Sequence, residues 1–89
     1  MTAAGLSALH LAASYRKRGA ARLLLDAKVN VDARDIDGVT PLMVAAGRGD
    51  LKMCKLLLEK GGAYIGQRDN EGNTALCYAA FRGGIKLLR

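Results

Sequence analysis

The apolar positions in residues 50–60 predict an amphipathic helix that begins near Asp50, a residue well suited to an N-cap. Apolar side chains there recur at i, i+3, i+6 and i+7 and share one face, at Leu51, Cys54, Leu57 and Leu58. The opposite face is charged, at Lys52, Lys55 and Glu59. We expect the apolar face to be buried and a left-handed glycine, Gly61 or Gly62, to end the helix.

A shorter helix is predicted just before it, over residues 42 to about 48. Residues 35–38 have the composition of a turn, because Asp bonds the backbone ahead of it and Gly tolerates positive φ. Thr40 fits the N-cap and Pro41 the first helical position, where a missing N–H group costs nothing. The unit therefore consists of a turn, a short helix, a second turn, a longer helix and a loop.

Parts of this unit occur three times along the chain. Glycines spaced 33 and then 34 residues apart mark its starts, at Gly5, Gly38 and Gly72. A hydroxyl at the expected helix start keeps the same register, at Ser7, Thr40 and Thr74. Because one helix pair cannot bury its own apolar face, such a period predicts helix pairs that stack on one another.

The segment GVTPLMVAAGRGDLKMCKLLLEKGGA resembles an ankyrin repeat, whose family hallmark includes Thr-Pro-Leu-His-x-Ala. The resemblance covers nearly the whole chain in three registers. It implies an all-α ankyrin-repeat solenoid of stacked helix-turn-helix pairs, with β-turn finger loops projecting at right angles. It also implies one domain over residues 1–89, with repeats at about 5–37, 38–71 and, truncated, 72–89.

Three positions depart from the family pattern. Only the first copy has the family histidine, His10, which the resemblance implies bonds to the helix-start hydroxyl and nearby backbone; the later copies have Met43 and Cys77. Arg18 aligns with Leu51, a position expected to face the core, so either Arg18 snorkels or the first helix pair is locally reregistered. Lys28 replaces a capping glycine, and a left-handed conformation there would cost about 1 kcal/mol.

The third copy ends at Arg89 without the leucine triplet of the other two. Its last residues, GGIKLLR, could form a shortened second helix. Terminal repeats of a solenoid need a polar outer face, and this end lacks a full one. We therefore expect a fragment of a longer array, or a monomer or minimal protein that is capped by a partner or by further repeats.

The charge balance admits several partner classes. The chain has 14 Lys and Arg residues against 8 Asp and Glu, a net charge of +6, which attracts nucleic acid, anionic lipid and acidic protein alike. Two distant cysteines fit reduced apolar residues of an intracellular protein better than a disulfide framework or a metal site. With no signal-peptide pattern and no apolar run of about 20 residues, we expect a cytoplasmic or nuclear protein without membrane contact.

The sequence offers no catalytic constellation. It contains a single His and has no Gly-rich phosphate loop, no carboxylate pair with a base and no metal-spaced cluster. We therefore expect no enzyme activity, no cofactor and no metal.

The resemblance implies that a partner protein binds the concave face made by the finger tips and the first helices. Matching the copies residue by residue gives these candidate contact residues: Tyr15, Ile36, Asp37, Val39, Val44, Arg48, Asn70, Glu71, Asn73, Tyr78, Phe81 and Arg82. The aromatic and arginine side chains among them are of the types that anchor interfaces.

Charge is divided along this face. The fingers are acidic, at Asp35, Asp37, Asp69 and Glu71, and the far ends of the short helices are basic, at Arg16, Lys17, Arg18, Arg48, Arg82 and Lys86. Helices packed about 8–10 Å apart would set the equivalent positions Tyr15, Arg48 and Arg82 as a ladder, which suits an acidic or phosphorylated partner. The alternative is a module for nucleic acid or another anionic ligand, disfavoured because acidic fingers interrupt the basic residues and no aromatic stacking platform accompanies them.

Overall fold

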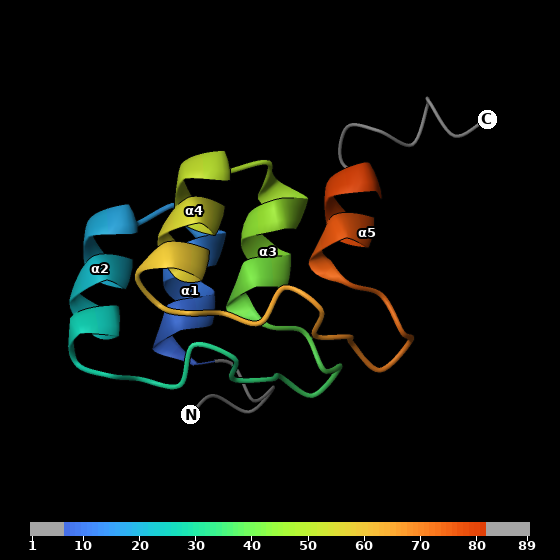
Figure 1. Cartoon of the computed structure of the whole chain (residues 1–89), viewed down its shortest axis with the longest axis horizontal. Coiled ribbons are helices and arrows are strands. Elements are labelled where there is room, and N and C mark those ends of the chain that lie inside the picture. The colour runs from blue at the N-terminus through green and yellow to red at the C-terminus, as the bar shows by residue number, and fades with distance from the viewer. Residues whose placement is uncertain (1–6, 82–89) are drawn as a thin grey trace.

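The computed structural model describes residues 7–81, and these fold into stacked helix pairs joined by long loops (Figure 1). The first helices of the pairs pack side by side as one layer, formed by α1 (Ala8–Ser14), α3 (Pro41–Arg48) and α5 (Ala75–Ala79). The second helices form another layer, α2 (Arg18–Asp26) against α4 (Leu51–Glu59). Within the described range there are only helices, turns and loops, so the predicted all-α architecture is confirmed.

The predicted helix boundaries follow from local chemistry. The Thr40 hydroxyl accepts a hydrogen bond from the Met43 amide at 3.3 Å, and Pro41 occupies the first helical position. Gly49 ends this helix in the left-handed region, at φ 72°. The Asp50 carboxylate caps the next helix, accepting from the Met53 amide at 3.1 Å. Each cap gives a partner to an amide of the first helical turn, which has none within the helix, and this fixes where each helix starts.

The first copy ends both of its helices with non-glycine residues in left-handed backbone. Lys28 keeps the left-handed conformation of the glycine it replaces, at φ 64°, and closes α2: its amide donates to Leu25 O and the next amide donates to Leu24 O, the Schellman pattern. Arg16, at φ 59°, takes the position that Gly49 holds in the second copy. Each conformation costs about 1 kcal/mol relative to glycine.

The core is built from alanine, leucine and methionine side chains. Ala13 and Ala45 are fully buried between the first helices, which lets these helices approach closely. Met53 and Leu57 fill the inner side of α4 and are also fully buried. Many short contacts of this kind replace a large aromatic core.

The predicted inner face of α4 is wrong at one position. Leu51 is 80% exposed, whereas Met53 is 0% exposed. Two helical positions correspond to a rotation of about 200°, so a helix that buries Met53 must turn Leu51 to the solvent. Arg18 therefore needs neither a snorkelling path nor a new register, because the position it shares with Leu51 is an outer one.

Several sequence features lie outside the described residues. These are Gly5, Arg82 and the tail that could form a shortened second helix, residues 83–89. Within residues 7–81 there is no helix long and apolar enough to cross a membrane.

Candidate partner-binding surface

Each finger is shaped by an aspartate at its base. Asp35 Oδ1 accepts the amides of Asp37 at 2.9 Å and Val39 at 2.8 Å. Asp69 Oδ1 does the same for Glu71 at 2.9 Å and Asn73 at 2.8 Å. These bonds consume one carboxylate oxygen in each turn, and they leave Asp37 and Glu71 exposed at the tips.

Asn70 joins the second finger to the first. Its amide donates to Asp37 O at 2.9 Å, its side chain donates to Ile36 O at 3.0 Å, and Arg34 donates to its Oδ1 at 3.3 Å. A Cβ at Gly38 would lie 2.5 Å from that same Oδ1, so glycine is required at this contact as well as for its φ of 79°. The Asn70 side chain, a candidate contact residue, is thus already engaged within the chain.

A hollow of about 370 Å³ opens between the two fingers and α5. It is lined by Asp37, Val39, Asp69, Asn70, Glu71 and Tyr78. The Tyr78 hydroxyl donates to Asp69 Oδ2 at 2.5 Å, and Asp69 is itself buried. Several residues that the sequence placed among the candidate contact residues therefore lie around one hollow.

The Tyr78–Asp69 pair is held in one protonation state. Burial, followed by the hydrogen bond to the carboxylate, raises the pKa of Tyr78 well above its usual range. The Tyr78 hydrogen bond is the largest influence that lowers the pKa of Asp69, with backbone amides adding to it. At neutral pH the pair is a phenol that donates to a carboxylate, so the ring is fixed and the hollow is anionic.

The Tyr78 ring continues the surface onto α3. A Cβ at Gly47 would lie 3.5 Å from Tyr78 Cδ2, so the ring packs directly over this glycine. Val44, one turn earlier on α3, is half-buried. Together they form an apolar strip that leads from the hollow toward the end of α3.

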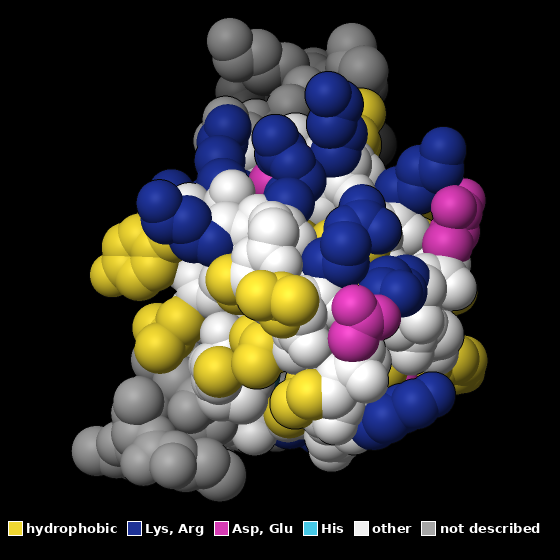
Figure 2. Space-filling view, turned by 90° about the vertical axis from the view of Figure 1, so that its left-hand side faces the viewer, with side chains coloured by type: hydrophobic (Ala, Val, Ile, Leu, Met, Phe, Trp, Pro, Cys, Tyr) yellow, Lys and Arg dark blue, Asp and Glu magenta, His cyan; other side chains and the backbone are white. Residues whose placement is uncertain are grey.

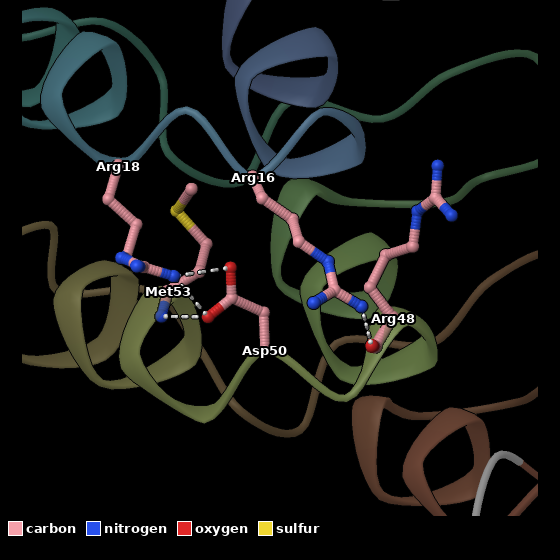
Figure 3. A network of polar contacts seen from close by, with 5 residues as sticks. All are labelled: Arg16, Arg18, Arg48, Asp50 and Met53. Atoms are coloured by element: carbon pink, nitrogen blue, oxygen red, sulfur yellow. Dashed lines mark hydrogen bonds and ion pairs between the residues drawn. The ribbon is translucent and has the colours of Figure 1, made fainter.

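The basic end of the surface links α1 to α3 (Figure 3). Arg16 donates to the Arg48 carbonyl at 2.9 Å, and the Arg48 guanidinium reaches the Ser14 hydroxyl at 3.5 Å. Tyr15 is 66% exposed beside them. Two of the three ladder positions thus lie at the ends of adjacent helices, Tyr15 just after α1 and Arg48 at the end of α3, whereas the third, Arg82, lies outside the described residues.

The remaining candidates differ in their accessibility. Ile36 is 70% exposed at the first finger, and Phe81 is 64% exposed just beyond α5. Asn73 is half-buried, and its side chain donates to Asp69 Oδ2 at 3.4 Å. Ile36 and Phe81 can therefore contact a partner without rearrangement.

His10 has a structural environment. Ser7 donates its amide to Nδ1 at 3.1 Å, its hydroxyl lies 2.8 Å from the same atom, and Nε2 lies 2.6 Å from the Val39 carbonyl. With Nδ1 accepting, Nε2 carries the proton and donates to Val39. The side chain is 1% exposed, so it joins the first copy to the base of the first finger and is not presented to a substrate.

The sequence did not single out the polar link between α2 and α4. Arg18 Nη1 lies 3.1 Å from Asp50 Oδ1 and 3.2 Å from Oδ2, and Asp50 also caps α4 (Figure 3). The alignment of Arg18 with a leucine was the available signal, since it marked a position where the copies differ in charge. No group of three or more metal-binding side chains is assembled within the described part of the chain.

Stacked helix pairs with a finger at each junction define a solenoid repeat protein, whose extended surface serves binding. The model of the family described as "Ankyrin repeats" matches residues 9–89 in three copies, so the chain belongs to the ankyrin-repeat family. Ankyrin repeats are generally protein–protein interaction modules, and the family is typically non-enzymatic.

Curated relatives share part of this chain. The mouse nuclear factor NF-kappa-B p105 subunit is 45% identical over 58 residues, 64% of this chain and 6% of the relative. The Drosophila melanogaster ankyrin repeat and KH domain-containing protein mask is 42% identical over 55 residues, 62% of this chain and 1% of the relative. The Arabidopsis thaliana E3 ubiquitin-protein ligase KEG is 40% identical over 57 residues, 64% of this chain and 4% of the relative. This chain therefore spans only a small part of each relative's length.

Proposed function

We propose that the chain is a non-catalytic intracellular scaffold or adaptor module, which holds a partner protein on the surface formed by its fingers and first helices. The repeats at about 5–37, 38–71 and 72–89 would act as one domain. The observation that carries the proposal is the continuity of this surface, which runs from the hollow at Tyr78 across α3 to Arg48 and Tyr15.

The chemistry of this surface supports protein binding. Tyr15 and Phe81 expose aromatic area at low cost in conformational entropy, and Arg48 offers a planar guanidinium. The surface is rigid where the fingers are joined through Asn70, so binding pays little for ordering the loops.

The two ends of the surface differ in sign, which would orient the partner. Asp37 and Glu71 make the finger end negative, and Arg16 with Arg48 makes the other end positive. An acidic or phosphorylated group of the partner fits the two guanidinium groups, because arginine binds such anions in a bidentate manner. The acidic finger end disfavours a long polyanion such as nucleic acid along the whole surface.

A paired substitution tests the surface. The immobilised chain is used to capture proteins from a cell extract, and the affinity of each captured protein is then measured for the wild type and for Tyr15→Ala/Arg48→Glu. We expect the double variant to raise the dissociation constant of the true partner about tenfold or more, as for interface anchors. Its circular dichroism spectrum is expected to be unchanged.

A matched control separates the surface from charge and composition. Tyr64→Ala/Lys28→Glu likewise removes one exposed tyrosine and reverses one exposed positive charge, at positions outside the surface. Equal losses of affinity in the two double variants, or no loss in the first, would show that the partner binds elsewhere. A labelled oligonucleotide with a steep dependence of affinity on salt would instead favour the nucleic-acid alternative.

A further inference from the structure

A second hollow lies on the other layer of the solenoid, between α2 and α4. Its volume is about 220 Å³, and it is lined by Arg22, Lys52, Lys55, Leu56, Glu59 and Lys60. The α4 residues 52, 55, 56 and 59 fall at i, i+3, i+4 and i+7, so they form one stripe of that helix. None of these side chains belongs to the surface of fingers and first helices.

The groove carries three cations without an ion-pair partner among residues 7–81. Lys60 Nζ is paired with Asp26 Oδ1 at 2.6 Å, which ties α4 to α2 at one end. Among residues 7–81, no ion pair forms to Arg22, Lys52 or Lys55. Figure 2 shows Lys and Arg side chains gathered over the upper part of the face that includes α2, with few acidic side chains among them. Like charges in one groove repel, so an anionic occupant relieves this repulsion.

Apolar area accompanies the charge. Leu56 is half-buried in the groove. A purely ionic ligand would leave the exposed part of Leu56 in water, whereas a peptide that carries both carboxylates and an apolar side chain would cover it.

We infer that the groove between α2 and α4 is a second docking surface, whose occupant is an acidic peptide segment of a protein that also carries an apolar side chain. The carboxylates contact Arg22, Lys52 and Lys55, and the apolar side chain packs on Leu56. An anionic membrane fits less well, because the groove is concave and a membrane surface is flat. This inference does not depend on the surface of fingers and first helices.

The test uses a fluorescein-labelled peptide of 12 residues with Glu at most positions and two central Leu. Fluorescence anisotropy at low ionic strength measures its affinity for the wild-type chain and for Lys52→Glu/Lys55→Glu. We expect the variant to bind about tenfold more weakly or worse, because close charge pairs become repulsive. The same peptide with Ser in place of Leu is expected to bind about fivefold more weakly, since its apolar contact is lost.

Lys28→Glu/Arg68→Glu is the matched control, because it changes the net charge by the same amount at exposed positions away from the groove. It and Arg48→Glu are expected to keep nearly all of the affinity. Lys52→Gln/Lys55→Gln repeats the comparison if the charge reversal unfolds the chain. Absence of binding to the wild type, or an equal loss in the control, overturns the proposal. Displacement of the peptide by vesicles of phosphatidylserine and phosphatidylcholine reassigns the groove to a membrane.

Discussion

Asp50 lies where the two layers of the solenoid meet, and its replacement tests how they are joined. Its side chain is 5% exposed and caps α4 through the Met53 amide, and both of its carboxylate oxygens accept from Arg18 Nη1. Asp50→Ala removes the cap and the ion pair together. Asp50→Asn keeps a capping oxygen and removes only the charge.

The expected magnitudes follow from these contacts. Loss of an N-cap costs about 1 kcal/mol. The Arg18 side chain is 46% exposed, so solvent screens the ion pair and its loss adds only about 0.5 kcal/mol. Asp50→Ala should therefore lower the free energy of unfolding by about 1.5 kcal/mol, or roughly 6–12 °C in Tm for a domain of this size. Asp50→Asn should cost about 0.5 kcal/mol.

Urea unfolding followed by circular dichroism measures both variants, and a double-mutant cycle with Arg18→Ala isolates the pair. We expect a coupling free energy of about 0.2–1 kcal/mol between Arg18 and Asp50. Equal losses for Asp50→Ala and Asp50→Asn would refute the cap as the larger contribution. Strict additivity with Arg18→Ala would remove the ion pair from the account.

Three further substitutions probe other contacts. Met43→His, which gives the second copy the histidine of the first, should raise the free energy of unfolding by about 1 kcal/mol, because an imidazole can form a hydrogen bond with the base of the next finger. Urea titrations measure this change, and a lower free energy of unfolding would contradict the prediction. Gly61→Ala should lower the free energy of unfolding by about 1–3 kcal/mol and Gly62→Ala by about 1 kcal/mol. A Cβ at Gly61 would lie 2.7 Å from a backbone oxygen, whereas a Cβ at Gly62, at φ 69°, would meet nothing. The reverse order of the two losses would contradict the packing. Tyr78→Phe should lower the free energy of unfolding at neutral pH and should flatten the decline of that free energy below about pH 4, because the lowered pKa of Asp69 stabilises the fold above the pKa that Asp69 has in the unfolded chain, and acidification removes this contribution. An unchanged acid profile would contradict the role of the pair.

Local chemistry allowed much of the fold to be predicted from the sequence. Thr40, Pro41 and Asp50 act within a few residues of themselves, so their caps follow from residue type and spacing alone. The left-handed Lys28 could be anticipated because its equivalent position requires a helix-ending turn. The threefold period then implied the stacking, since no single pair can bury its own apolar face.

Non-local packing limited the rest. Leu51 and Met53 are both apolar, and the packing of α4 against α3 and α2 decides which of them turns inward. The lock at Asn70 depends on the carbonyl of Ile36, which is 34 residues away in the sequence. Residue type marks such a side chain as polar and exposed, but it does not say whether its partner lies within the chain or outside it.

The most direct test of the central claim is a map of the backbone amide signals of the isotope-labelled chain, recorded by nuclear magnetic resonance during titration with the captured partner. The account predicts that the perturbed amides cluster at Tyr15, Arg48 and Tyr78 and at the fingers between them. Perturbations confined to α2 and α4, with those amides unchanged, would contradict it.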